Sequence, residues 1–149
     1  MNLKETLYNY CQEMLNERLQ VIQTAISDIQ NALLSETKST AGDKHETGRA
    51  MLQLEREKAG QQLAEIQKQF KILNKINPNQ EHNVVALGSI VYTTQANYFI
   101  STSLGEIELV KQKFFAISMA SPIARLLVGK TKDQSFLFRN EDITITKII

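Results

Sequence analysis

Two apolar seams run in mirrored order along the first part of the chain. Each recurs at alternating spacings of four and three residues, which is the rhythm of a coiled-coil helix. In an antiparallel pair, the residue numbers of two facing positions add up to the same total all along the pair. Leu33 with Leu52 and Ile22 with Leu63 fulfil this condition. We therefore predict two long helices that fold back near Gly42. The seams are Leu15, Leu19, Ile22, Ile26, Ile29 and Leu33, then Leu52, Ala59, Leu63, Ile66, Phe70 and Leu73, with Arg56 filling one place.

The pattern changes after the second helix, which predicts two domains in an α+β fold. Residues 1–77 form the antiparallel coiled-coil hairpin, with its tip near 36–47, and Pro78 ends the second helix because proline cannot continue its hydrogen bonds. Residues 78–149 are rich in β-branched and aromatic side chains, which predicts a small antiparallel sheet. Ser121 as N-cap, Pro122 and Gly129 predict one short helix. The predicted strands are 89–93, 98–101, 107–110, 114–117, 135–138 and 143–148.

Composition narrows the class of protein. Apolar residues make up 42% of the 149 residues and charged residues 22%, as in a soluble globular protein. No apolar run has the length of a membrane span and the first residues do not follow the plan of a signal peptide, so we expect a cytoplasmic protein. Cys11 is the single cysteine, expected as a reduced core thiol. The net charge of +1 does not favour autonomous nucleic-acid binding, so any encounter with DNA or RNA is expected to be arranged by a protein partner.

Three segments resemble the bacterial Gre transcript-cleavage factors. Residues 121–130 (SPIARLLVGK) are similar to the family's S-P-x-A-x-A-L-x-G-K segment, residues 88–91 (GSIV) to its G-S-x-V, and residues 42–46 (GDKHE) to the G-D-x-x-E-N of its tip. The resemblance implies a C-terminal domain with the fold of FK506-binding proteins. It also implies RNA polymerase as partner, Mg²⁺ shared with the polymerase as cofactor, and contact with nascent RNA through that complex. After Glu46 the family usually continues Asn, Ala, Glu, Tyr, whereas this chain has Thr47-Gly48-Arg49-Ala50.

The acidic pair at the predicted tip, Asp43 and Glu46, has two interpretations. An Asp N-cap followed three residues later by Glu is a capping box, which satisfies free amide groups at a helix start. Two carboxylates at an exposed helix start can also present oxygen ligands to Mg²⁺, which favours one or two carboxylates together with water or phosphate. In the Gre family the polymerase supplies the remaining ligands. His45 between the two acids could join a transition-metal site, or it is a solvated histidine.

Other candidate residues are basic or belong to the segment 121–130. Lys38, Lys44 and Arg49 near the tip could steer an RNA phosphate chain or merely solvate the loop. Arg56 could contact RNA phosphates, or pack its stem in the seam while its guanidinium reaches water. His82 lies in the linker with no partner visible in the sequence. The segment 121–130 could dock on the polymerase through Ser121, Pro122, Arg125 and Lys130, or be only a well-capped helix.

These observations leave four functions open. The resemblance implies a transcription elongation factor that inserts its hairpin into the polymerase secondary channel and stimulates cleavage of backtracked RNA by the polymerase itself. The altered residues after Glu46 favour a Gre-like regulator that does not promote cleavage. A peptidyl-prolyl isomerase or chaperone-like module is a third hypothesis, although fold does not transfer function and the chain has no Trp for an aromatic cleft. An enzyme with its own active site lacks a recognisable motif.

Overall fold

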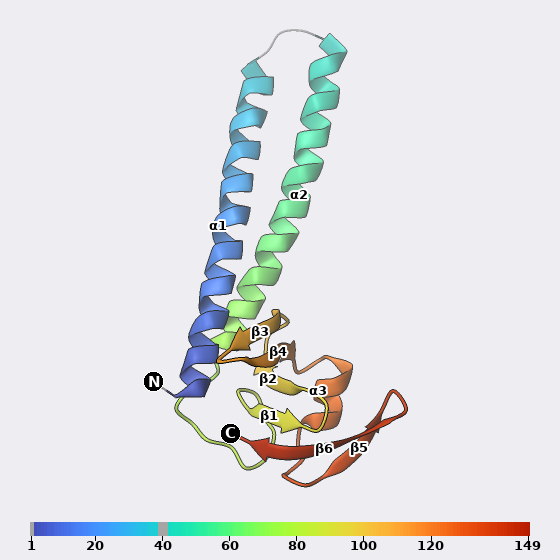
Figure 1. Ribbon diagram of the computed structural model, residues 1–149. Helices are drawn as coiled ribbons and strands as arrows, with labels where there is room; N and C mark the ends of the chain where they lie inside the picture. The colour runs from blue at the N-terminus through green and yellow to red at the C-terminus, as the bar shows by residue number, and fades with distance from the viewer. Residues whose placement is uncertain (1, 39–41) are drawn as a thin grey trace. The chain divides into compact units, whose positions relative to one another are not determined.

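The computed structural model describes the backbone of residues 2–38 and 42–149 and, within these ranges, the side chains of all but 37, 38 and 42–45. It confirms a long helical hairpin followed by a mostly antiparallel sheet with one short helix (Figure 1). The chain divides into two compact units, Leu15–Phe70 and Met1–Met14 with Lys71–Ile149. The predicted domain boundary between residues 77 and 78 stays a prediction. No helix in the described part of the chain is long and apolar enough to cross a membrane.

The first unit contains most of two helices. Helix α1 spans Leu3–Lys38 and helix α2 spans Gly42–Leu73, and they run side by side in opposite directions (Figure 1). Their apolar cluster is drawn from the two mirrored seams, so the hairpin predicted from the period is confirmed. The buried members are Ile22, Ile26, Ala59 and Ile66, with Leu19, Ile29, Leu63 and Phe70 packed against them.

The second unit is built on a six-stranded sheet. The strands are β1 (Ile90–Thr93), β2 (Asn97–Ser101), β3 (Gly105–Leu109), β4 (Gln112–Ser118), β5 (Ser135–Phe138) and β6 (Glu141–Ile148). Their order across the sheet is β3-β4-β2-β1-β6-β5. All neighbours are antiparallel except β2 and β4, which are parallel. The chain leaving β2 forms the edge strand β3 first and then returns as β4 between them, so this pair departs from the antiparallel arrangement that we predicted.

Both faces of the central strands are buried. Successive side chains of a strand point to opposite faces, and Ile90, Val91, Phe99 and Ile100 are all 0% exposed. Helix α3 (Pro122–Leu127) packs on the face that carries Val91 and Ile100. This cluster joins α3 to strands β1, β2 and β6. Its buried members are Val85, Val91, Ile100, Ile123, Ala124, Leu127, Ile143 and Ile145.

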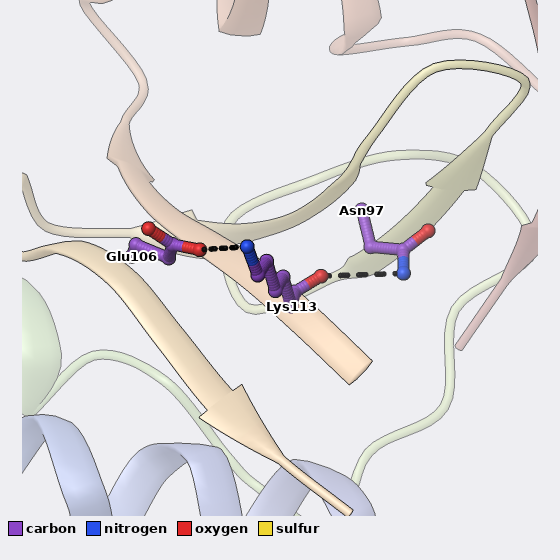
Figure 2. Close-up of polar contacts among 3 residues, drawn as sticks. All are labelled: Asn97, Glu106 and Lys113. Carbon is purple, nitrogen blue, oxygen red and sulfur yellow. Dashed lines mark hydrogen bonds and ion pairs between the residues drawn. The ribbon is translucent and has the colours of Figure 1, made fainter. Parts of the chain in front are cut away.

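Polar side chains occupy the surface of β2, β3 and β4. Lys113 forms an ion pair with Glu106 at 3.3 Å, and its carbonyl oxygen accepts a hydrogen bond of 3.3 Å from the side-chain amide of Asn97 (Figure 2). Both members of the ion pair are exposed to solvent. Exposed pairs contribute only about 0–1 kcal/mol, so this contact adds little to the stability of the sheet.

Candidate functional site at the end of the hairpin

The predicted acidic pair lies at the start of α2, but only one of its side chains is described. Helix α2 begins at Gly42, so residues 43 and 46 are separated by three positions in its first turns, a spacing that places two residues on neighbouring parts of one helical surface. Glu46 is exposed to solvent. The side chain of Asp43 lies outside the described residues, as do those of Lys38, Lys44 and His45. The two interpretations of the pair therefore stay predictions.

The donor chemistry of this helix start fits a hard cation in part. A carboxylate exposed to solvent, such as that of Glu46, suits Mg²⁺, which binds one or two carboxylates and completes its shell with water or phosphate. Among the described residues no group of three or more His, Cys, Asp or Glu side chains could hold a metal ion.

Arg49 is the basic residue of the hairpin end whose side chain the structure places. It is half-buried, and its Nη1 donates a hydrogen bond of 3.3 Å to the carbonyl oxygen of Leu33 on the other helix. Next to it, a Cβ atom on Gly48 would lie 3.5 Å from Oε1 of Glu36, also on the other helix. Arg49 therefore contacts the last turns of α1, and the side chain of Glu36 lies close to Gly48.

Arg56 lies farther along α2, in the place that interrupts the second apolar seam. Its side chain is half-buried, and its Nη1 is the nearest atom, at 3.0 Å, to the position of a Cβ on Gly60. The guanidinium therefore lies along its own helix, one turn further on, beside Gly60. Its predicted contact with RNA phosphates stays a prediction.

The segment 121–130 forms a fully capped helix. The Ser121 hydroxyl accepts a hydrogen bond of 3.3 Å from the Ala124 amide and donates one of 2.8 Å to the Ser118 carbonyl. Pro122 occupies the first turn, and Gly129 follows the helix with a φ of +88°, a conformation that favours glycine. The predicted helix, its cap and its stop are confirmed. Pro122 and Arg125 are exposed.

Lys130 closes the same segment. Its Nζ lies 5.6 Å from the centroid of the Phe136 ring, close enough for a cation–π interaction. The docking role predicted for Ser121, Pro122, Arg125 and Lys130 stays a prediction, but the described geometry separates them. Ser121 and Lys130 make contacts within the domain, whereas Pro122 and Arg125 face solvent.

Sequence reasoning missed a polar cluster where the first turn of α1 meets the segment before the sheet. Lys4 is only 2% exposed, and its Nζ donates a hydrogen bond of 2.6 Å to the Gln80 carbonyl. Burial lowers the pKa of Lys4, and the charge of Glu81 partly opposes that effect. His82, for which the sequence showed no partner, has its Nδ1 2.6 Å from the hydroxyl of the buried Ser89. Burial and the charge of Lys4 lower the pKa of His82.

Cys11 is a buried thiol, as predicted. Burial raises its pKa to about 12, partly opposed by a hydrogen bond with the side chain of Ser101. A thiol that stays protonated at neutral pH is a poor nucleophile and a poor metal ligand. Cys11 is therefore part of the packing and not of a reactive site.

No protein-family model matches this chain, and no curated protein matches it. Among solved structures, the chain is similar to one described as the structure of the transcription factor Gfh1. The identity is 15% and the TM-score 0.35, and the match covers 95% of this chain and 92% of that one.

Proposed function

We propose that the protein is an accessory transcription factor that binds RNA polymerase, inserts its hairpin into the secondary channel and stimulates cleavage of backtracked RNA by the polymerase itself. The observation that supports the proposal is that two Gre-like motifs occur in one chain, each in the matching structural element. The residues that resemble the Gre tip motif begin the second helix of a hairpin, and the residues that resemble the Gre C-terminal segment form the capped helix α3 of a β domain. In this proposal the protein has no catalytic site of its own.

The chemistry assigned to the hairpin is that of ligands and not of a nucleophile. Asp43 and Glu46 would hold Mg²⁺ together with the polymerase's own carboxylates, where the ion supplies the charge that activates water and stabilises the leaving oxygen of a phosphodiester. The exposed carboxylate of Glu46 is available for such sharing. The two side chains would thus act only in the reacting complex, so they should affect the cleavage rate more than the affinity.

A non-cleaving regulator of the same polymerase is the second candidate. Thr47-Gly48-Arg49 replaces the residues that follow the Gre tip motif, and here Arg49 donates a hydrogen bond to the other helix. In this case the hairpin would occupy the channel and slow nucleotide addition without promoting cleavage.

One double variant tests metal sharing and separates the two candidates. Asp43→Asn with Glu46→Gln keeps the shape of both side chains and removes both negative charges, so stimulated cleavage should fall by at least about 10²-fold while affinity for the polymerase stays nearly the same. Cleavage is measured on backtracked polymerase complexes with and without the protein. The matched control, Asp28→Asn with Glu57→Gln, makes the same changes at exposed positions of the two helices and should have no effect. If the unmutated protein binds polymerase but stimulates no cleavage, the first candidate function is wrong and the second takes its place.

Docking through the C-terminal domain is tested on the full chain. Arg125 is exposed on α3, and Arg125→Ala should weaken polymerase binding about tenfold or more if this helix lies in the interface. Lys132→Ala removes an exposed charge just beyond the segment and serves as control. Equal affinities of both variants and the unmutated protein would move the docking surface away from α3.

A further inference from the structure

Apolar packing between the two helices fades toward the end of the hairpin. The buried cluster reaches Ile29 on α1 and Ala59 on α2, and no described residue beyond them toward the tip belongs to it. Leu33 and Leu52, the predicted seam pair nearest the tip, are only half-buried. Leu34, Met51 and Leu54 are exposed large apolar residues of the same region. The packed apolar seam therefore ends before the last turns of α1 and the first turns of α2.

The described contacts across this region are polar. The hydrogen bond from Arg49 to the Leu33 carbonyl joins residues that lie 16 positions apart in the chain, and it is partly shielded from solvent. At the neighbouring position, the side chain of Glu36 on α1 lies within 4 Å of where a Cβ on Gly48 would be. A guanidinium is always charged and presents several donors in a rigid plane, so it suits a fixed hydrogen bond to a carbonyl better than a lysine does.

We propose that Arg49 is a positioning residue, which fixes the start of α2 against the end of α1 and so sets where the Glu46 carboxylate stands. Glu46 precedes Arg49 by three residues, less than one helical turn, so a displacement at residue 49 is carried directly to it. This role differs from the RNA contact predicted from the sequence. The geometric part of the inference needs no partner, whereas its consequence for the polymerase rests on the proposed function.

Spin labels on the two helices test the geometric part in the full chain. Ser35 and Ala50 are exposed on α1 and α2, and Cys replacements there can be labelled while the buried Cys11 stays unreactive. The distance distribution between the labels, measured by electron paramagnetic resonance, should be narrow and should broaden in Arg49→Met. Arg18→Met, the same change at an exposed position of α1, should leave it unchanged. An unchanged distribution in Arg49→Met would overturn the inference.

Activity on polymerase tests the functional part. Arg49→Met should lower the maximal effect at saturating protein by about 10²-fold without a matching loss of affinity, and Arg49→Lys, which keeps the charge and N–H donors but not the rigid guanidinium plane, should restore part of it. Loss of the effect with an unchanged label distance would show that Arg49 touches the nucleic acid directly, and the inference would be wrong. If the unmutated protein has no effect on polymerase, the proposed function fails, and the label distances alone then decide the role of Arg49. Circular dichroism identifies any variant that has lost its helices. If Arg49→Met has lost them, the label distance and the activity are both measured on Arg49→Lys instead.

Discussion

The hairpin and the sheet bury their apolar side chains to different depths. In the sheet, Phe99 and Phe114 are fully enclosed, because both faces of the central strands are covered. In the hairpin, Ile22 and Ile26 each keep 9% of their surface exposed, since a pair of helices covers only one side of each seam residue. An open groove of about 540 Å³ runs beside Ile22 and Ile66, and Val21 on its rim is 69% exposed. One region is therefore a closed core and the other a narrow seam.

This difference predicts unequal costs for core truncation. Phe99→Ala leaves a cavity in an enclosed site and should lower the free energy of unfolding by about 3–5 kcal/mol. Ile66→Ala removes a buried side chain that borders an open groove, where water and neighbouring side chains can fill the space, so the loss should lie near about 2 kcal/mol, the low end for such substitutions. Chemical denaturation followed by circular dichroism measures both. Equal losses would mean that the hairpin seam is as closed as the sheet.

Amide hydrogen exchange then locates each effect. Ile66→Ala should speed exchange in residues 15–70 and leave the central strands protected, because the two units are separately compact. Uniformly faster exchange over the whole chain would show that the two units unfold as one.

The next expected effect is a loss of stability at alkaline pH that comes from Cys11. This residue belongs to α1 in sequence but to the compact unit of the sheet. Its folded pKa of about 12 lies above the value of about 8.5 for a free thiol, so the unfolded state releases its proton first and is favoured as pH rises. The contribution of the protonated thiol to the free energy of unfolding is complete well below pH 8.5. It falls as pH rises from there toward pH 12, by at most about 1.4 kcal/mol per pH unit.

The measurement is the difference between the unmutated protein and Cys11→Ala at pH 8, 9 and 10. Taking the difference between the two proteins removes the contributions of other groups that titrate at high pH. These include Lys4 with its lowered pKa and Tyr92 with its raised pKa. Parallel pH dependences of the two proteins would show that the thiol is more accessible than its buried position implies.

The sequence predicted what depends on local period and composition. The seams predicted the two helices. Ser121, Pro122 and Gly129 predicted the limits of α3, because an N-cap, the fixed φ of proline and a left-handed glycine act within a few residues. It did not give the parallel pairing of β2 with β4, since alternation within a strand carries no information about its neighbour. The turn before β6 is formed by Arg139 and Asn140, both with positive φ, so the last strand begins two residues earlier than we predicted.

The missed contacts are those that depend on tertiary position. Lys4 has the sequence context of a surface lysine in a first helical turn, and only the fold brings the Gln80 carbonyl to it. Arg49 likewise has the context of a solvated tip residue until the antiparallel register places the Leu33 carbonyl beside it. The acidic residues of the predicted tip were identified from their spacing and from the resemblance, and the side chain of Asp43 lies outside the described residues.

The smallest expected effect compares two glycines within the hairpin. Glycine inside a helix costs about 0.5–1 kcal/mol relative to alanine, because it loses more backbone freedom on folding. A Cβ on Gly48 would lie 3.5 Å from Glu36 Oε1, an ordinary contact, so Gly48→Ala should raise stability by about that amount. A Cβ on Gly60 would lie 3.0 Å from Arg56 Nη1, so the guanidinium must shift and Gly60→Ala should gain less. Thermal unfolding of both variants measures the difference. A loss of stability in Gly48→Ala would mean that Glu36 is held too tightly to yield, and that the polar end of the hairpin is packed as closely as its apolar seam.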